Sequence, residues 1–127
     1  MLERIAPVGG PHASGAYAPA IRAGNLVFVS GQGPFDPSSG ELAAEDIAGQ
    51  VRRTLANVAL VLEAVGAGLS DVVRVDAYLA NIEDFADYDD TFREVFGERL
   101  PTRTTVEAGL GSILVEINAI AYIDDAT

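Results

Sequence analysis

One arginine and one glutamate interrupt segments that otherwise have the composition of core strands. The stretch PTRTTVEAGLGSILVEINAIAYI, residues 101–123, holds Arg103 and Glu116 among β-branched and apolar residues. An arginine at such a place concentrates positive charge and can bind an anionic substrate. From the pattern alone, a cross-strand ion pair is the simpler interpretation, because such pairs are common in sheets.

Composition limits the other chemistry that the chain can perform. There are no cysteines and a single histidine, His12, so thiolate nucleophiles, cysteine metal sites and histidine-rich metal centres are excluded. Carboxylates, hydroxyls, arginines and backbone groups remain. The net charge of −11 repels phosphate backbones, so we expect no nucleic-acid partner. The P-loop, the dinucleotide-binding glycine motif, the zinc-protease motif and the hydrolase serine elbow are all absent.

Several further polar residues have an ordinary structural interpretation when each is taken singly. Ser30 ends a strand, Tyr17 is an anchoring aromatic, and Asp89 lies on a solvated helix face. His12 stands in an exposed loop rich in Gly and Pro. The acids from Glu83 to Asp90 are consecutive and do not follow a calcium-loop pattern, so we expect no metal site.

The elements that must position these residues fit one domain spanning residues 1–127. Periodicity predicts strands near 18–22, 25–31, 72–79, 102–108 and 114–123, and helices near 47–65 and 84–96. The order is β-β-α-β-α-β-β, with a possible small strand near Leu42. No segment approaches the roughly eighteen apolar residues of a membrane span, and the start lacks a signal peptide, so we expect a cytoplasmic protein without a membrane partner.

Strand alternation predicts which face each residue occupies. Arg103 and Thr105 share one face of their strand, and Glu116 shares a face with Asn118. The small and apolar set of the last strand suits the surface under the helices, which would leave Arg103 and Glu116 together on the opposite face. Two helices can cover only one face of such a sheet, so the other face must be buried by something else. This predicts an oligomer.

A resemblance adds to this interpretation. GAYAPAIRAGNLVFVSGQGPFDPSSGEL, EAVGAGLSDVVRVDAYLANIEDF, FGERLPTRTTVEAGL and VEINAIA occur in order along nearly the whole chain and are similar to the Rid (YjgF) family of reactive imine deaminases. The resemblance implies a chorismate-mutase-like α+β fold with one mixed sheet and two helices on one face. It also implies a homotrimer with sites in clefts between subunits, and no cofactor. In the family, the 72–79 strand lies between the two tail strands, whereas the loop Gly-Leu-Gly-Ser read alone suggests a hairpin.

The resemblance assigns roles residue by residue. It implies that Arg103 binds the substrate carboxylate and that Glu116 holds a water molecule and acts as its general base. Tyr17 and Ser30 fall on site positions, and backbone groups near Thr105 and the turn from Ser30 through Gly31 to Gln32 would stabilise the intermediate. The catalytic set is thus Glu116, Arg103 and Thr105, and the substrate-binding set is Arg103, Tyr17, Ser30, Gly31, Gln32 and Asp89.

Departures from the family pattern concern substrate shape. Thr105 stands where the family often has cysteine, and Asp89 stands where it often has asparagine. The implied activity is hydrolysis of small 2-imino acids, formed from 2-aminoacrylate-type enamines, to 2-keto acids and ammonia. Three alternatives stay open: a non-catalytic trimer that binds small carboxylates, a pathway-specific deaminase of a larger imine, and an endoribonuclease, which the charge of −11 disfavours.

Overall fold

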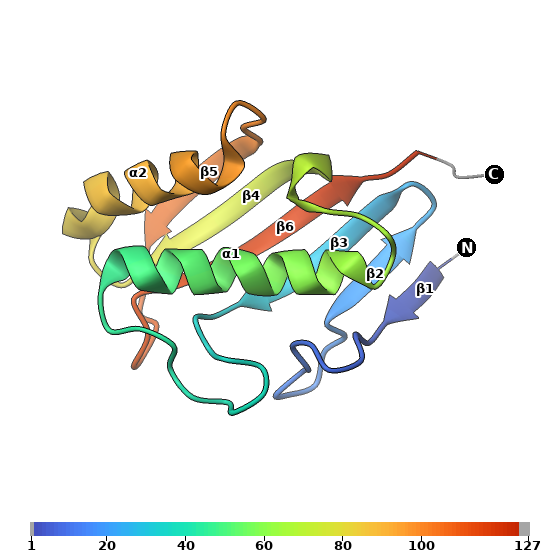
Figure 1. Cartoon of the computed structure of the whole chain (residues 1–127), viewed down its shortest axis with the longest axis horizontal. Helices are drawn as coiled ribbons and strands as arrows, with labels where there is room; N and C mark the ends of the chain where they lie inside the picture. The colour runs from blue at the N-terminus through green and yellow to red at the C-terminus, as the bar shows by residue number, and fades with distance from the viewer. Residues whose placement is uncertain (1, 125–127) are drawn as a thin grey trace.

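The computed structural model describes residues 2–124, and the strands among them form one six-stranded sheet (Figure 1). The strand order is β1-β2-β3-β6-β4-β5, and only β4 and β5 pair in parallel. The strands are β1 (Leu2–Ile5), β2 (Ala20–Ala23), β3 (Leu26–Gln32), β4 (Val72–Leu79), β5 (Thr102–Glu107) and β6 (Val115–Tyr122). Both tail strands therefore border β4, one on each side.

Two helices lie on the same face of this sheet, as Figure 1 shows. Helix α1 spans Ile47–Glu63 and crosses the middle strands, and α2 spans Phe85–Phe96 near β4 and β5. Asp46 caps α1 by accepting a hydrogen bond from the Gly49 N–H at 3.4 Å. Gly97 ends α2 with a φ of 65°, a left-handed conformation that glycine adopts without strain. No helix within residues 2–124 is long and apolar enough to cross a membrane.

The hydrophobic core fills the space between the helices and the sheet. Alternate residues of β6, from Val115 to Ala121, are buried there, and α1 buries an apolar stripe against them. Within residues 2–124, no helix lies over the opposite sheet face. On that open face, Leu26, Phe28 and Tyr122 are each more than a third exposed.

Most of the sequence-based predictions of the fold are confirmed. The α+β class, the mixed sheet and the two helices on one face agree with the structure, and β4 lies between β5 and β6 as the family resemblance implied. The hairpin interpretation of the tail is wrong. The start of the chain forms the additional strand β1, paired with β2, and the segment near Leu42 makes only an isolated bridge with Phe35.

The prediction that Arg103 and Glu116 share a sheet face is wrong. Arg103 pairs in register with Val75, which is buried under the helices, whereas Glu116 pairs with Tyr78 on the open face. Residues that pair across neighbouring strands point to the same side of a sheet. Because Val75 and Tyr78 are an odd number of positions apart on β4, their partners must lie on opposite faces.

The core accounts for stability, and two valines allow a matched test of this. Val58 is 1% exposed in α1, whereas Val8 is fully exposed at 103%. We expect Val58→Ala to lower the free energy of unfolding by about 2 kcal/mol, because it removes two buried methyl groups and leaves a cavity. Val8→Ala should change it by less than about 0.5 kcal/mol. Urea unfolding at one protein concentration measures both, and equal losses would contradict the assigned core.

Candidate functional site

The guanidinium of Arg103 lies on the helix face, between β5 and α2. Its Nη2 is 2.8 Å from Oδ1 of Asp89, and its Cζ lies 4.8, 5.0 and 5.5 Å from the ring centroids of Phe92, Tyr88 and Phe85. A cation over aromatic faces is attracted by the ring quadrupoles. The three rings and the carboxylate therefore hold this guanidinium in one place.

The sequence of α2 explains why these rings gather there. Phe85, Tyr88, Phe92 and Phe96 recur at spacings of three and four residues, so they form one stripe along the helix. Neighbouring rings lie 4.6–5.8 Å apart between centroids. The stripe faces β5, where Arg103 projects. Phe92 is the ring of this stripe that borders a pocket of about 240 Å³, which is lined by Asp89, Phe92, Arg93, Leu100, Pro101 and Arg103. We call this the arginine pocket.

Thr105 lies on the same face of β5, two residues beyond Arg103. Its hydroxyl is hydrogen-bonded to the Tyr88 hydroxyl at 2.7 Å. Tyr88 is fully buried, and this burial raises the pKa of its phenol, while the contact with Thr105 and the charge of Arg103 partly oppose the rise. Thr105 thus ties β5 to α2 beside the guanidinium, and its side chain lines neither pocket described here.

Glu116 belongs to a second pocket, of about 430 Å³. Tyr17, Gly31, Gln32 and Glu116 all line it, together with Pro11, His12, Ser14, Pro19, Gly33, Phe35, Asp36, Pro37, Gly40, Asn57 and Ile113. We call this the glutamate pocket. A β-carbon added at Gly31 would collide with the Glu116 carboxylate, so glycine is required for the carboxylate to lie against the β3 backbone. Glu116 is therefore held at the rim between β3 and β6.

An irregularity in the pairing of β3 with β6 shapes this rim. The register shifts between Val29 and Gln32, which leaves Ser30 and Gly31 outside the regular ladder. The Ser30 hydroxyl donates to the Ala18 carbonyl at 2.6 Å, so it fastens the N-terminal loop. The Gln32 amide donates to the Ser30 carbonyl at 3.2 Å. The hydroxyl of Tyr17 accepts a hydrogen bond from the Ser14 N–H at 3.2 Å.

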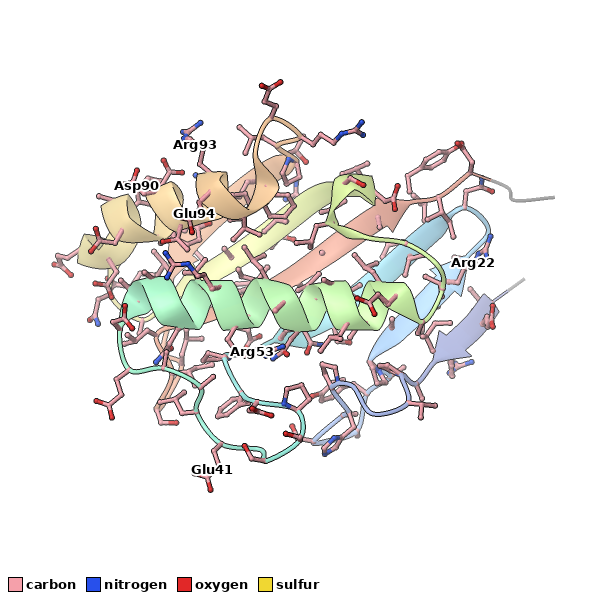
Figure 2. All side chains as sticks on the ribbon, in the orientation of Figure 1. Arg22, Glu41, Arg53, Asp90, Arg93 and Glu94 are labelled. Carbon is pink, nitrogen blue, oxygen red and sulfur yellow. The ribbon has the colours of Figure 1, made fainter. Side chains whose placement is uncertain are left out.

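Sequence analysis missed a row of polar residues on α1, one of which, Asn57, lines the glutamate pocket. Gln50, Thr54 and Asn57 are buried at helical spacing inside the apolar stripe. The Asn57 amide donates to the Gly33 and Phe35 carbonyls at 2.9 and 2.8 Å. Its oxygen accepts from Arg53, which is labelled on α1 in Figure 2, at 2.8 and 3.1 Å. Polar residues within an apolar helical stripe are the signal that could have found this row, because buried amides require partners.

Two loop residues also face the glutamate pocket. His12 was interpreted as an exposed loop residue; it is exposed, and it also lines this pocket. Hydrogen bonds from the side chain and backbone of Ser38 lower the pKa of Asp36, which lies on the same wall. Within residues 2–124, no three acidic or histidine side chains are grouped so that they could hold a metal ion.

The candidate residues therefore divide into two groups. Arg103, Thr105 and Asp89 lie together at β5 and α2, and the remaining candidates lie at the β3–β6 rim: Tyr17, Ser30, Gly31, Gln32 and Glu116. The first group can bind an anion, because its cation is fixed and partly exposed. The second group offers a carboxylate that can accept a proton. Arg103 and Glu116, the charged residues of the two groups, point to opposite faces of the sheet.

The fold and these two polar pockets define a chorismate-mutase-like α+β domain. A structure of Escherichia coli TdcF with bound serine matches with a TM-score of 0.88 at 30% identity and covers 96% of this chain and 100% of that one. A RutC family protein of Pyrococcus horikoshii is 43% identical over 124 residues, which are 96% of this chain and 98% of that protein. The 2-iminobutanoate/2-iminopropanoate deaminase of Escherichia coli is 35% identical over 126 residues, covering 95% and 98%.

A family model described as endoribonuclease L-PSP matches residues 9–123. The chain therefore belongs to this family, the Rid (YjgF) family that its sequence resembles.

The burial of Tyr88 has a consequence for stability at alkaline pH. Because the pKa of Tyr88 is raised in the folded chain, the unfolded chain loses this proton first as the pH passes its ordinary value of 10.0. The unfolded state then binds fewer protons than the folded state, so stability falls above that pH. We expect the parent protein to lose more unfolding free energy between pH 8 and 11 than Tyr88→Phe does.

The control is Val8→Ala, which changes a fully exposed side chain that carries no titratable group. This variant should follow the parent curve at every pH. Urea unfolding monitored by circular dichroism measures all three proteins, and parallel curves for the parent and Tyr88→Phe would contradict the assigned burial.

Proposed function

We propose that this protein hydrolyses small 2-imino acids to 2-keto acids and ammonia. The observation that carries the proposal is the fixed guanidinium of Arg103, which is partly exposed in a pocket and suits a ligand carboxylate. The 35% identity to a protein named as a 2-iminobutanoate/2-iminopropanoate deaminase supports this substrate class. Glu116 supplies the carboxylate that such a hydrolysis requires.

The opposite placement of the two groups supports a site built from two copies of the chain. Within one chain, Arg103 projects under α2 while Glu116 lies on the open face, so the sheet separates them. The homotrimer that we propose buries the open faces and has its sites in clefts between subunits, with Arg103 of one copy beside Glu116 of the next. The exposed Leu26, Phe28 and Tyr122 on that face support its burial in an assembly.

The proposed reaction runs in two steps. Arg103 binds the substrate carboxylate and fixes the imine carbon, and Glu116 takes a proton from water as the oxygen attacks that carbon. When the imine enters as its protonated form (C=NH2+), the C=N π electrons move to nitrogen, and this gives a neutral amino-alcohol with the water proton held on Glu116. Glu116 then gives this proton to the nitrogen, and as the carbon–nitrogen bond breaks it takes the hydroxyl proton, so that the carbonyl forms and ammonia leaves. No cofactor is needed, because the C=N carbon is already electrophilic.

The other candidate residues have supporting roles in this proposal. Backbone groups near Thr105 and along Ser30–Gln32 hydrogen-bond the intermediate. The Ser30 hydroxyl donates to the Ala18 carbonyl and its N–H donates to the Pro19 carbonyl at 2.9 Å, so Ser30 fixes the position of this turn. Tyr17 lines the same pocket as Glu116 and comes from the copy that supplies the base.

Substitution of either Arg103 or Glu116 should abolish deamination. We expect Arg103→Ala and Glu116→Ala each to reduce the rate of keto-acid formation by about 100-fold or more, because each removes a group that acts on the reacting atoms. 2-Aminoacrylate and 2-iminobutyrate are generated in situ with a serine/threonine dehydratase, and surviving imine is trapped with semicarbazide.

The controls for this assay are Arg52→Ala and Glu63→Ala, which remove exposed charges of the same kind from α1. Both should retain the parent rate, and circular dichroism checks that every variant is folded. A folded parent protein without activity would overturn imine deamination.

A shared site also makes the two inactive variants complementary. Co-expression of Arg103→Ala and Glu116→Ala chains should restore activity, because a site between one intact arginine and one intact glutamate can form. In a randomly mixed homotrimer at equal amounts, about one quarter of the sites would be intact. Mixed protein as inactive as its parts would show that both residues act from one copy or that no such trimer forms.

A second candidate function is small-carboxylate binding without catalysis. The serine held by the TdcF structure favours it, since that relative binds an amino acid. Arg103→Ala would then abolish ligand binding while the parent protein releases no ammonia. If the substrate is a larger imine, deamination should be seen with that imine and not with the small 2-imino acids. The family description as an endoribonuclease has no support in this chain's charge of −11.

A further inference from the structure

Opposite charges lie side by side in the arginine pocket. One carboxylate oxygen of Asp89 is 2.8 Å from Nη2 of Arg103, and the other is 3.6 Å from Nη2 of Arg93. The side chains of Asp89 and Arg103 are 28% and 21% exposed, and both line the pocket. A ligand that reaches the guanidinium therefore also meets a carboxylate.

Neither partner of this pair is free to move away. The three aromatic rings around Arg103 hold its guanidinium, and Asp89 is fixed on α2 between two arginines. Arg103 has five N–H donors, and its ion pair with Asp89 engages Nη2. The remaining donors can bind a ligand carboxylate without displacing Asp89.

The pair treats two kinds of ligand differently. A plain carboxylate gains the attraction of Arg103 but suffers the repulsion of Asp89, which is a close like charge. A ligand with a cationic nitrogen on the carbon next to its carboxylate can satisfy both side chains at once. Its carboxylate binds Arg103, and its N–H donates to Asp89.

We propose that Asp89 is a specificity residue that selects ligands carrying a protonated nitrogen α to the carboxylate. This inference rests on the proposed role of Arg103 in binding the substrate carboxylate. For a 2-imino acid, the selected form is the iminium, whose carbon is a stronger electrophile than that of the neutral imine. The negative charge of Asp89 favours this protonated form, because opposite charges stabilise each other. Asp89 thus directs binding towards the form that water attacks most readily.

Two unreactive ligands test the inference. L-Alanine and propanoate have the same carbon chain and carboxylate, and only alanine carries the α-ammonium. In ligand-observed NMR titrations of the whole protein, we expect the parent to bind alanine about tenfold more tightly than propanoate. Asp89→Asn should remove or reverse this preference, weakening alanine and strengthening propanoate.

The matched control is Asp90→Asn, which removes the same charge from the neighbouring residue. Asp90 is exposed on α2 and does not line the arginine pocket (Figure 2). Asp90→Asn changes the net charge of the chain by the same amount as Asp89→Asn. It should keep the parent preference for alanine, since Asp90 does not line the arginine pocket. A general effect of net charge would change the affinities for alanine and propanoate equally in Asp89→Asn and Asp90→Asn.

Three results would overturn the inference: tighter or equal binding of propanoate by the parent, an equal change of both ligands in Asp89→Asn, or no binding of either ligand. A role of Asp89 in merely orienting Arg103 predicts the equal change. The titration is independent of the deamination assay. An alanine preference without deamination would leave the inference standing and reject the proposed reaction, and deamination without the preference would do the reverse.

Discussion

The pairing of β4 with both tail strands is the constraint on which the rest of the structure depends. β4 binds β5 in parallel on one side and β6 in antiparallel on the other. Because side chains alternate along every strand, this register alone sends Arg103 under the helices and Glu116 to the open face. The activity that we propose therefore requires a second copy of the chain, which would place Arg103 and Glu116 in one site.

The helices then determine what the arginine pocket and the glutamate pocket can bind. The aromatic stripe of α2 surrounds the guanidinium of Arg103, so its charge is held by ring faces and by one acid. The polar row of α1 performs the corresponding task at the other end, where Asn57 fixes the carbonyls of the loop that walls the glutamate pocket. In both places a helix buries apolar surface on one side and positions polar chemistry at its edge.

Electrostatics in this chain are local. The net charge of −11 gives no long-range attraction for anions, yet Arg103 and Arg93 face one small pocket with Asp89 between them. Such an arrangement favours a ligand that carries both signs of charge over a simple anion. Membership of the family rests on nearly the whole chain, whereas the ligand preference that we propose depends on Asp89 alone.

The sequence by itself determined the element types and the candidate residues. Apolar periods of two and of three to four residues identified the long strands and both helices, because burial on one face imposes those periods. The family resemblance supplied the order of the strands. The short strand β1 escaped prediction, since LERI is mostly exposed and shows no clear alternation. Only the tertiary structure decided which face each candidate occupies, because the face depends on the register with β4, and register is a relation between distant segments that no local pattern records.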